Sequence, residues 1–511
     1  MLNISLTFNK KDFEYDVYSL VRAFYPGSQV KMFYTPEAEE AAADQSNSQG
    51  DALQSQARET VPAEEMEYDK TYTITYLPEE IIFAAGDGTA KSAAVSEKED
   101  RVVRKNLLKQ LVYQTLSQET GRELPWGDLT GIRPTKIPMG LLEQGWKNTE
   151  IAEHMRNTYF CSPAKTALAL ATANREKAIL QEFDYKTGYS LYVGIPFCPS
   201  ICLYCSFGSH ALKTWKHMIE PYLEALFKEL DFIAEKMKGW RLDTVYIGGG
   251  TPTSLEAEQL DRLLGKIQAS FDLKDVREFT VEAGRPDTIT GDKLAAIRKY
   301  PVTRISINPQ TMNQNTLELI GRKHTVEETI QVFKMARDMG FDNINMDLIV
   351  GLPGEGKAEV AHTLEQVKQL DPESLTVHSL ALKRATRLNL FKDQYEEISF
   401  ENSAEIMEMT EHCAREMEMG PYYLYRQKNI AGNFENVGYS KVDKYGIYNI
   451  LIMEEKQTIM AAGSGASTKF VFQNGERIER VENVKDLKNY VERIDEMLER
   501  KQQGIDQYLG R

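Results

Sequence analysis

Three of the chain's five cysteines lie within eight residues, in the segment GIPFCPSICLYCSF. Cys198, Cys202 and Cys205 have the spacing C-x3-C-x2-C, and thiolates that close together can hold a zinc ion or an iron–sulfur cluster. A structural zinc ion takes four ligands, and His210 is available as the fourth. A [4Fe–4S] cluster held by three thiolates would instead keep one iron open for another molecule. Three reduced thiols packed in a loop are the third alternative, and the spacing leaves all three open.

Two further segments carry residues that suit ligand binding. In YIGGGTPTSL, Gly249 and Gly250 allow close backbone approach, and their N–H groups can face an anionic or polar ligand. The alternative for this segment is a tight turn into the following helix. In TVEAGRPD, Glu282 sits within an apolar strand, where a carboxylate is costly unless it is paired or hydrogen-bonded. An ion pair with a cation such as Arg304 is the structural alternative for Glu282.

Each of these segments ends a short apolar run that favours a β-strand, and amphipathic segments of helix length separate the runs. This alternation indicates βα units around a parallel sheet, and six units predict a partial (β/α)6 barrel. Chemistry in such barrels lies at the C-terminal ends of the strands, which is where the motifs fall. The predicted strands are residues 189–196, 242–249, 278–283, 304–310, 343–353 and 374–382, and the predicted helices include 217–237 and 256–270.

The sequence on either side of the barrel predicts further modules, and the fold class is α/β. The first 35 residues have the pattern of strand, helix and strand, and the acidic insertion after them is too poor in large apolar residues to fold. An amphipathic helix is predicted to begin at about residue 101. The predicted parts are a small α+β module (1–100) with a disordered insertion (36–69), a helical segment (101–185), the partial barrel (186–390) and a small C-terminal α+β module (391–511).

Composition excludes several classes of function. The net charge of −15 opposes non-specific nucleic-acid binding, which needs a basic surface. The sequence contains no run of 18 apolar residues, so we expect no membrane span, and its first residues lack the pattern of a secretion signal. A low, odd number of cysteines suits a reducing compartment, and we predict a cytoplasmic protein. Cys161 and Cys413 stand alone and are expected to be buried and inert.

The cysteine spacing, after the first strand of a βα array, resembles the radical S-adenosylmethionine (SAM) superfamily. The context LYVGIPFCPSICLYCSF looks like one branch, the oxygen-independent coproporphyrinogen III dehydrogenase family, over about residues 186–475. The resemblance implies a [4Fe–4S] cluster on the three cysteines and SAM on the fourth iron, where its reductive cleavage gives a 5′-deoxyadenosyl radical. It implies SAM contacts from Tyr192, Gly249, Gly250, Thr251, Glu282, Gln310, Arg322, Asp347 and Ala381.

The same resemblance implies a reaction and its partners. Two propionates of the tetrapyrrole coproporphyrinogen III would be decarboxylated oxidatively to vinyl groups, giving protoporphyrinogen IX without oxygen. The cluster would need an electron donor such as flavodoxin or ferredoxin, and the substrate would need an electron acceptor that the sequence does not identify. Candidate contacts to substrate carboxylates are Lys383, Arg384 and Arg426, with solvated loop charges as the alternative for the first two.

Other functions remain open, because one fold serves many chemistries. One alternative is a haem-binding or haem-transfer protein that keeps the cluster, although the HNxxYW segment of haem chaperones is absent. Another is a radical SAM methyltransferase or another enzyme that modifies a tetrapyrrole. The chain also departs from the family pattern: Gly194 replaces a frequent histidine, and Gly284 and Arg285 occupy a turn that normally has an acidic or amide residue. His378 is expected to be a hydrogen-bonded core histidine.

Overall fold

The computed structural model describes residues 2–36, 67–96, 98–206, 208–381, 402–427, 434–472, 475 and 477–510. Most of the predicted insertion, residues 37–66, lies outside these ranges. The chain forms two compact units, one of Met1–Ile132 with Leu141–Leu168 and one of Arg133–Gly140 with Ala169–Arg511.

The first unit is built on a five-stranded sheet with the order β2-β1-β3-β4-β5. Strand β1 is parallel to both of its neighbours, β2 and β3, whereas β3 with β4 and β4 with β5 pair antiparallel. Parallel strands need a crossover connection, and helix α1 supplies the one between β1 and β2. The bounds are β1 (Asn3–Phe8), α1 (Glu14–Phe24), β2 (Gln29–Tyr34), β3 (Lys70–Tyr76), β4 (Glu80–Ala85) and β5 (Ala90–Ala94).

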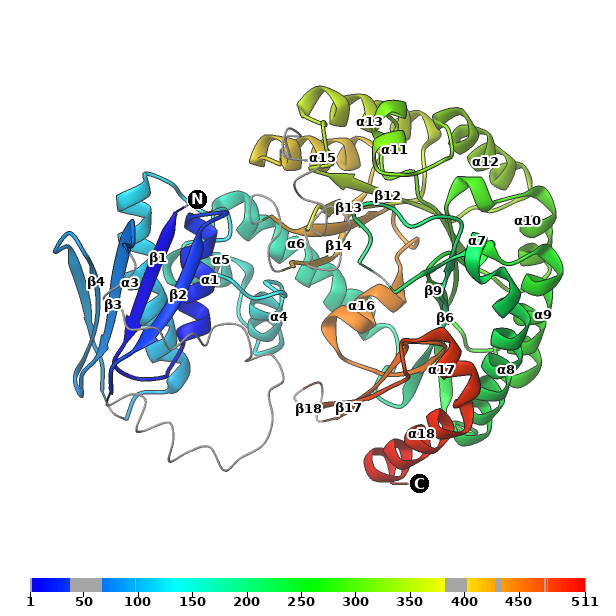
Figure 1. The fold of residues 1–511 in the computed structure, drawn as a ribbon, viewed down its shortest axis with the longest axis horizontal. Coiled ribbons are helices and arrows are strands. Elements are labelled where there is room, and N and C mark those ends of the chain that lie inside the picture. The colour runs from blue at the N-terminus through cyan, green and yellow to red at the C-terminus, as the bar shows by residue number, and fades with distance from the viewer. Residues whose placement is uncertain are drawn as a thin grey trace. The chain divides into compact units, whose positions relative to one another are not determined.

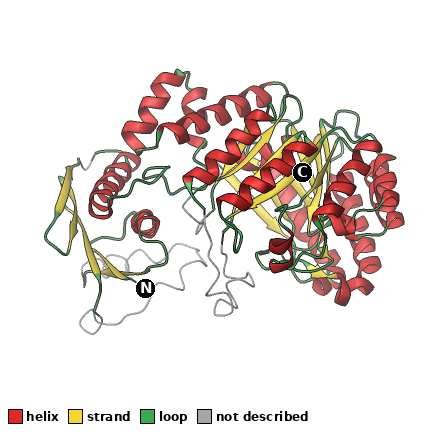
Figure 2. Ribbon diagram, turned by 90° about the horizontal axis from the view of Figure 1, so that it is seen from above, coloured by secondary structure: helices red, strands yellow, loops and turns green. Residues whose placement is uncertain are grey.

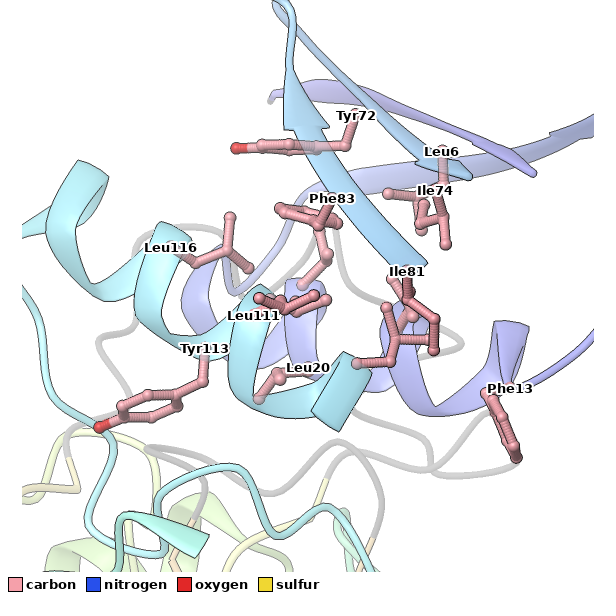
Figure 3. Packing of buried hydrophobic residues seen from close by; sticks show 14 of the residues in the cluster. Leu6, Phe13, Leu20, Tyr72, Ile74, Ile81, Phe83, Leu111, Tyr113 and Leu116 are labelled. Carbon is pink, nitrogen blue, oxygen red and sulfur yellow. The ribbon is translucent and has the colours of Figure 1, made fainter. Parts of the chain in front are cut away.

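Two helices cover one face of this sheet and close its core (Figure 3). Side chains alternate along a strand, so every second residue of β3 and β4 points to the helices. Helix α3 (Arg101–Thr120) begins at the predicted position, where the Asp100 carboxylate accepts a hydrogen bond from the Val102 N–H. The rings of Tyr72 and Phe83 stack with centroids 5.3 Å apart. The core residues labelled in Figure 3 include Leu6, Leu20, Ile74, Ile81, Leu111 and Leu116.

The second unit contains an eleven-stranded sheet with the order β14-β15-β13-β12-β11-β10-β9-β6-β16-β17-β18. All six predicted barrel strands are present in it as a parallel array. They are almost entirely buried, as expected for parallel strands covered on both faces. Their bounds are β6 (Gly188–Ile195), β9 (Arg241–Gly249), β10 (Glu278–Gly284), β11 (Arg304–Ile307), β12 (Ile344–Val350) and β13 (Ser374–Ser379).

Amphipathic helices pack on the outside of the curved parallel strands (Figures 1 and 2). Helix α8, for example, buries Tyr222, Leu226, Leu230 and Ile233 on one face and leaves its other face in solvent. Each helix connects the end of one strand to the start of the next, so the carboxyl ends of the strands share one rim. The outer helices are α8 (Ile219–Lys236), α9 (Ala257–Ser270), α10 (Gly291–Arg298), α12 (Val326–Asp338) and α13 (Lys357–Leu370).

The C-terminal part of the chain shares the barrel's sheet and extends it at both edges. Strand β16 pairs in parallel with β6, and β15 pairs antiparallel with β13, so neither end of the parallel array is a free edge. The pairing of β16 with β6 brings together residues about 270 positions apart. The sequence pattern did not predict this pairing. The bounds are β14 (Gly420–Tyr425), β15 (Asn436–Ser440), β16 (Thr458–Ala462), β17 (Ser467–Phe472) and β18 (Arg477–Glu482).

Shorter elements and the remaining helices complete the described chain. They are α4 (Lys136–Glu143), α5 (Asn148–Tyr159), α6 (Pro163–Gln181), β7 (Phe197–Cys198), β8 (His210–Ala211), α7 (Leu212–Trp215), η1 (Lys216–Met218), η2 (Pro252–Ser254), η3 (Pro286–Thr288), α11 (Gln314–Leu319), α15 (Ala404–Glu416), α16 (Ile447–Glu454), α17 (Leu487–Glu492) and α18 (Ile494–Leu509). Within the described ranges, no helix combines the length and apolar character that a membrane crossing requires. All five cysteines are free of disulfides.

Candidate active site

The carboxyl ends of the six barrel strands surround one cavity of about 420 Å³. Each strand, or the loop directly after it, contributes side chains to the cavity wall, as expected for a βα array. The cavity brings together the three clustered cysteines and all nine residues predicted to contact SAM. These residues are Cys198, Cys202, Cys205, Tyr192, Gly249, Gly250, Thr251, Glu282, Gln310, Arg322, Asp347 and Ala381.

The three candidate substrate cations are placed differently. Lys383 and Arg384 lie outside the described residues. Arg426 is buried, and the cavity wall includes its neighbours Tyr425 and Gln427 but not Arg426 itself. Successive residues of an extended segment point in opposite directions, so a chain that directs Tyr425 and Gln427 into the cavity directs Arg426 away from it.

The cysteine loop is fastened to neighbouring segments at several points. Short strands β7 and β8 pair with each other and bring the end of the loop back beside Cys198. The Leu203 N–H donates to the Ile320 carbonyl over 3.0 Å, and the Ser200 hydroxyl donates to the Gly321 carbonyl over 3.2 Å. Cys198 Sγ lies 3.4 Å from the Thr251 hydroxyl, and burial raises the pKa of the Cys198 thiol.

The donor set fits a cluster better than a single metal ion. Among the described residues, no three His, Cys, Asp or Glu side chains converge on a point where one ion could be held. A [4Fe–4S] cluster has no such requirement, because each thiolate binds a different iron. His210 is not part of the cavity wall, and its ring packs edge-on against Trp215 with centroids 4.8 Å apart.

Two N–H groups of the glycine-rich segment are hydrogen-bonded within the protein. The N–H groups of Gly250 and Thr251 donate to the carbonyls of Ile195 and Phe197, both over 2.8 Å, so they do not face a ligand. A Cβ atom on Gly250 would lie 2.6 Å from the Phe197 carbonyl oxygen. Glycine is therefore needed because the end of β9 closes directly onto the chain that leads into the cysteine loop.

Glu282 is a partly buried carboxylate that has no cationic partner in the described chain. The Tyr246 hydroxyl donates to its Oε1, and a Cβ at Gly248 would come within 2.8 Å of its Oε2. The predicted alternative of an ion pair with Arg304 does not hold, because Arg304 Nη1 donates instead to the Ser374 hydroxyl over 2.7 Å. Burial raises the pKa of Glu282 to about 7, and the negative charge of Asp347 acts in the same direction.

The tail of β11 presents three unsatisfied polar side chains to the cavity. Ser306, Asn308 and Gln310 alternate along an extended segment, and all three line the wall. Their side-chain oxygens are buried and have no hydrogen-bond partner among the residues that the structure describes. Buried polar atoms almost always have partners, so these three mark a wall that is completed by a polar ligand. Of these three residues only Gln310 is predicted from the sequence, although the i, i+2, i+4 spacing of all three is a signal for one face of a strand.

Gln310 also ends the strand earlier than predicted. Its φ of 71° is left-handed, a conformation that is uncommon outside glycine and that clusters at functional sites. Two backbone hydrogen bonds with β12 hold it there, from the Gln310 N–H to the Asp347 carbonyl and from the Ile349 N–H to the Gln310 carbonyl, both 2.9 Å. The regular strand consequently stops at Ile307, and Gln310 keeps only an isolated bridge.

Asp347 and His378 form a second polar group on the wall. Asn345 Nδ2 donates to Asp347 Oδ1 over 2.7 Å, and His378 Nε2 lies 4.0 Å from Asp347 Oδ2. The Tyr425 hydroxyl is 3.3 Å from His378 Nδ1. His378 therefore faces the cavity instead of the core, contrary to the expectation from sequence. Burial lowers the pKa of its imidazole, which keeps the ring neutral at neutral pH.

Comparison with known proteins places this arrangement in a family. Residues 192–367 match the Radical SAM superfamily. The chain is 43% identical over 420 residues to the oxygen-independent coproporphyrinogen-III oxidase-like protein HemZ of Bacillus subtilis, an alignment that covers 81% of this chain and 84% of that protein. The chain belongs to the HemZ-type family of radical SAM proteins. The family predicted from the cysteine motif is confirmed.

More distant relatives share the central part of this radical SAM chain. The heme chaperone HemW of Bacillus subtilis is 38% identical over 198 residues, which cover 39% of this chain and 52% of that protein. The chain thus matches about half the length of the chaperone. The solved structure of coproporphyrinogen III oxidase (HemN) from Escherichia coli has a TM-score of 0.50 and 24% identity, covering 63% of this chain and 72% of that one. This likeness confirms the α/β fold class.

Radical SAM proteins use a [4Fe–4S] cluster and SAM, so the predicted cofactors are confirmed for the family to which this chain belongs. The residues on the cavity wall fit both groups. Three thiols on one loop would hold three irons, and the unpaired oxygens of Ser306, Asn308 and Gln310 offer acceptors to a polar cofactor. Rings of Tyr192 and Tyr246 on the same wall are nearly parallel, with centroids 6.3 Å apart.

One charged residue of this radical SAM site was noted in the sequence only as a departure from the family pattern. Arg285 is buried against the cysteine loop, where its Nη1 donates to the Ser200 hydroxyl over 2.8 Å. A charged residue after a strand is usually solvated, and only the three-dimensional contact with a loop 85 positions away reveals its role.

Proposed function

We propose that this protein is an oxygen-independent coproporphyrinogen III dehydrogenase, which converts two propionates of coproporphyrinogen III to vinyl groups. The observation that carries the proposal is the alignment with HemZ over 84% of that protein's length, together with a wall that contains every residue expected for cluster and SAM. HemZ is described as coproporphyrinogen-III oxidase-like, whereas the chaperone HemW of the same organism aligns over about half its length.

The bound cluster and SAM would supply the radical that removes a hydrogen atom from a propionate. The protein's own residues hold the reactants and keep water away from them. Asp347 and Glu282 offer carboxylate groups to hydrogen-bond donors on the cavity wall, and Gln310 offers a further acceptor. Loss of the hydrogen atom, one electron and CO2 converts each propionate to a vinyl group, so an electron acceptor is required as well as a donor for the cluster.

The part of the cavity lined by C-terminal residues suits a tetrapyrrole. Tyr423 and Tyr425 have parallel rings 6.3 Å apart, and Gln427 and Asn436 add hydrogen-bonding groups beside them. Aromatic faces pack well against flat or curved ring systems. Lys383 and Arg384 remain proposed contacts for substrate carboxylates. A flavodoxin or ferredoxin is the proposed electron donor, and a cytoplasmic location is proposed because free cysteines suit a reducing compartment.

The direct test is an anaerobic assay of the reconstituted protein with a strong reductant, SAM and coproporphyrinogen III. Chromatography after oxidation should reveal protoporphyrin, and methionine and 5′-deoxyadenosine should be released with it. Cys202→Ala should abolish both products. Cys413→Ala is the matched control, since Cys413 is a buried thiol outside the cavity wall, and it should retain activity. SAM cleavage without any change in the porphyrinogen would refute the substrate, and protein without cluster absorption would refute the chemistry.

A second candidate is haem binding or haem transfer, which the 38% identity to HemW supports. Titration of the same reconstituted protein with haem distinguishes the two candidates. Stoichiometric haem binding with no protoporphyrin product would favour transfer. A methyltransferase acting on a tetrapyrrole would instead release S-adenosylhomocysteine, which the same chromatographic run detects.

A further inference from the structure

Arg285 is a buried cation in direct contact with the cysteine loop. It follows β10, and its side chain is 3% exposed. Its Nη1 donates to the Ser200 carbonyl over 3.0 Å and to the Ser200 hydroxyl over 2.8 Å, and lies 3.8 Å from Cys202 Sγ. Of the atoms in the guanidinium group, Nη1 is therefore the one that reaches the sulfur and its loop.

Asp287 fixes the orientation of this guanidinium. Its two carboxylate oxygens accept from Arg285 Nε over 2.9 Å and from Arg285 Nη2 over 2.7 Å, a bidentate pair with defined geometry. The third nitrogen is consequently left pointing at Ser200 and Cys202. Arg285 and Asp287 are only two positions apart on the turn after β10. The backbone at the end of this strand therefore determines where the guanidinium lies.

Other charged groups around Cys202 leave the site with an excess of positive charge. Arg322 is buried close by, where its Nε donates to the Tyr204 hydroxyl over 3.2 Å. His324 Nδ1 is 3.9 Å from Asp287, but burial and the neighbouring Arg322 charge lower the pKa of His324 to about 3, so its ring is neutral. Two guanidinium groups thus face one carboxylate in this part of the described structure.

We infer that Arg285 is a positioning residue that raises the reduction potential of the cluster by donating to the Cys202 sulfur. A hydrogen bond to a ligating sulfur and a nearby positive charge both stabilise the reduced, more negative cluster. The contacts with Ser200 hold the loop so that the donor stays in place. Asp287 opposes part of the effect because its charge has the opposite sign. The inference rests on the family's cluster and is independent of which tetrapyrrole is the substrate.

The test is a reductive titration of the reconstituted full chain, followed by cluster absorbance and electron paramagnetic resonance, without any tetrapyrrole. At one fixed applied potential, Arg285→Gln should lower the ratio of reduced to oxidised cluster about tenfold, which corresponds to about 59 mV for one electron. Asp287→Asn should raise the same ratio, because it removes the opposing charge. Arg285→Lys, which keeps the charge but not the bidentate pair, should lie between wild type and Arg285→Gln.

Arg337→Gln is the matched control. Arg337 also donates to a carboxylate, that of Glu373 over 2.6 Å, but it lies at the end of α12 and is not part of the cavity wall. Its variant should have the wild-type potential. Iron and sulfide content would be measured for every variant, so that a poorly loaded protein is recognised.

Arg285→Gln is expected to lower the reduction potential and Asp287→Asn to raise it. A purely structural role would not predict shifts of opposite sign. A wild-type potential in a fully loaded Arg285→Gln protein would overturn the inference. If Arg285→Gln fails to take up the cluster, the test rests on Asp287→Asn and Arg285→Lys. A lower or unchanged reduction potential in Asp287→Asn would then overturn the inference. Because no substrate is present, failure of the proposed decarboxylase activity would leave these results unaffected.

Discussion

Glu282→Gln should make the ligand-free protein more stable, and the gain should grow as pH rises. Burial raises the pKa of this carboxyl from 4.5 to about 7, since no described cation compensates its charge. The folded chain therefore keeps a proton that the unfolded chain releases at lower pH. The contribution of Glu282 to the free energy of unfolding of the wild-type protein is fully present below pH 4.5. It is lost as pH rises through about 7.

The size of the effect follows from the difference between the two pKa values. One pKa unit corresponds to about 1.4 kcal/mol, so an ionised Glu282 costs the folded state up to about 3 kcal/mol above pH 7. Glutamine keeps the shape of the side chain and can still accept from the Tyr246 hydroxyl. The free energy of unfolding of Glu282→Gln should therefore exceed that of wild type by an amount that widens by about 3 kcal/mol between pH 4 and pH 8.

Denaturant unfolding followed by circular dichroism at pH 4, 5, 6, 7 and 8 measures this difference. Glu258→Gln is the control, because Glu258 is exposed on α9, and its profile should run parallel to that of wild type. Parallel profiles for Glu282→Gln and wild type would refute the argument that the Glu282 charge is desolvated without a compensating cation. In the reconstituted protein, SAM should stabilise Glu282→Gln less than wild type, since a ligand stabilises by its affinity for the folded state.

Three further changes test other parts of the site and its supports. Gly250→Ala should destabilise by about 1–3 kcal/mol in thermal unfolding, because its Cβ would meet a backbone carbonyl at 2.6 Å, whereas Gly194→Ala, with no contact under 3.4 Å, should be nearly neutral. Lys501→Met should cost about 3–5 kcal/mol in denaturant unfolding, because it leaves the wholly buried carboxylate of Glu229 without its cation 3.3 Å away; an unchanged midpoint would contradict this. Gln310→Gly should stabilise the free protein by about 1 kcal/mol by relieving its left-handed backbone, and should weaken SAM binding measured by calorimetry.

The sequence predicts the parallel array well because each strand carries its own local signal. Burial on both faces gives near-continuous apolar runs, and the amphipathic helices between them have a clear period. Three of the six strands begin at the predicted residue, and the other three begin one residue away from it. The carboxyl-end rule then places the candidate residues around one cavity, which is where the structure has them.

Contacts between distant segments account for what the sequence did not predict. Several C-terminal strands could pair with the free edge of β6, and no local sequence pattern specifies that β16 does so. The Gly250 N–H was expected to face a ligand, because the sequence does not show that a carbonyl of the neighbouring strand end is within reach. His378 was expected in the core, because one strand residue cannot reveal whether its face meets side chains or a cavity.

The cysteine loop shows why cluster binding and folding must be coupled. Its anchors are Thr251 from the second barrel strand, Arg285 from the third, and the Ile320 and Gly321 carbonyls after the fourth. These segments lie up to 121 positions from the loop in sequence and meet only in the assembled barrel. A cluster that binds three thiolates in this arrangement binds the folded state alone, so its binding energy adds to the stability of the barrel. A change at any anchor should therefore reduce cluster retention before it unfolds the chain.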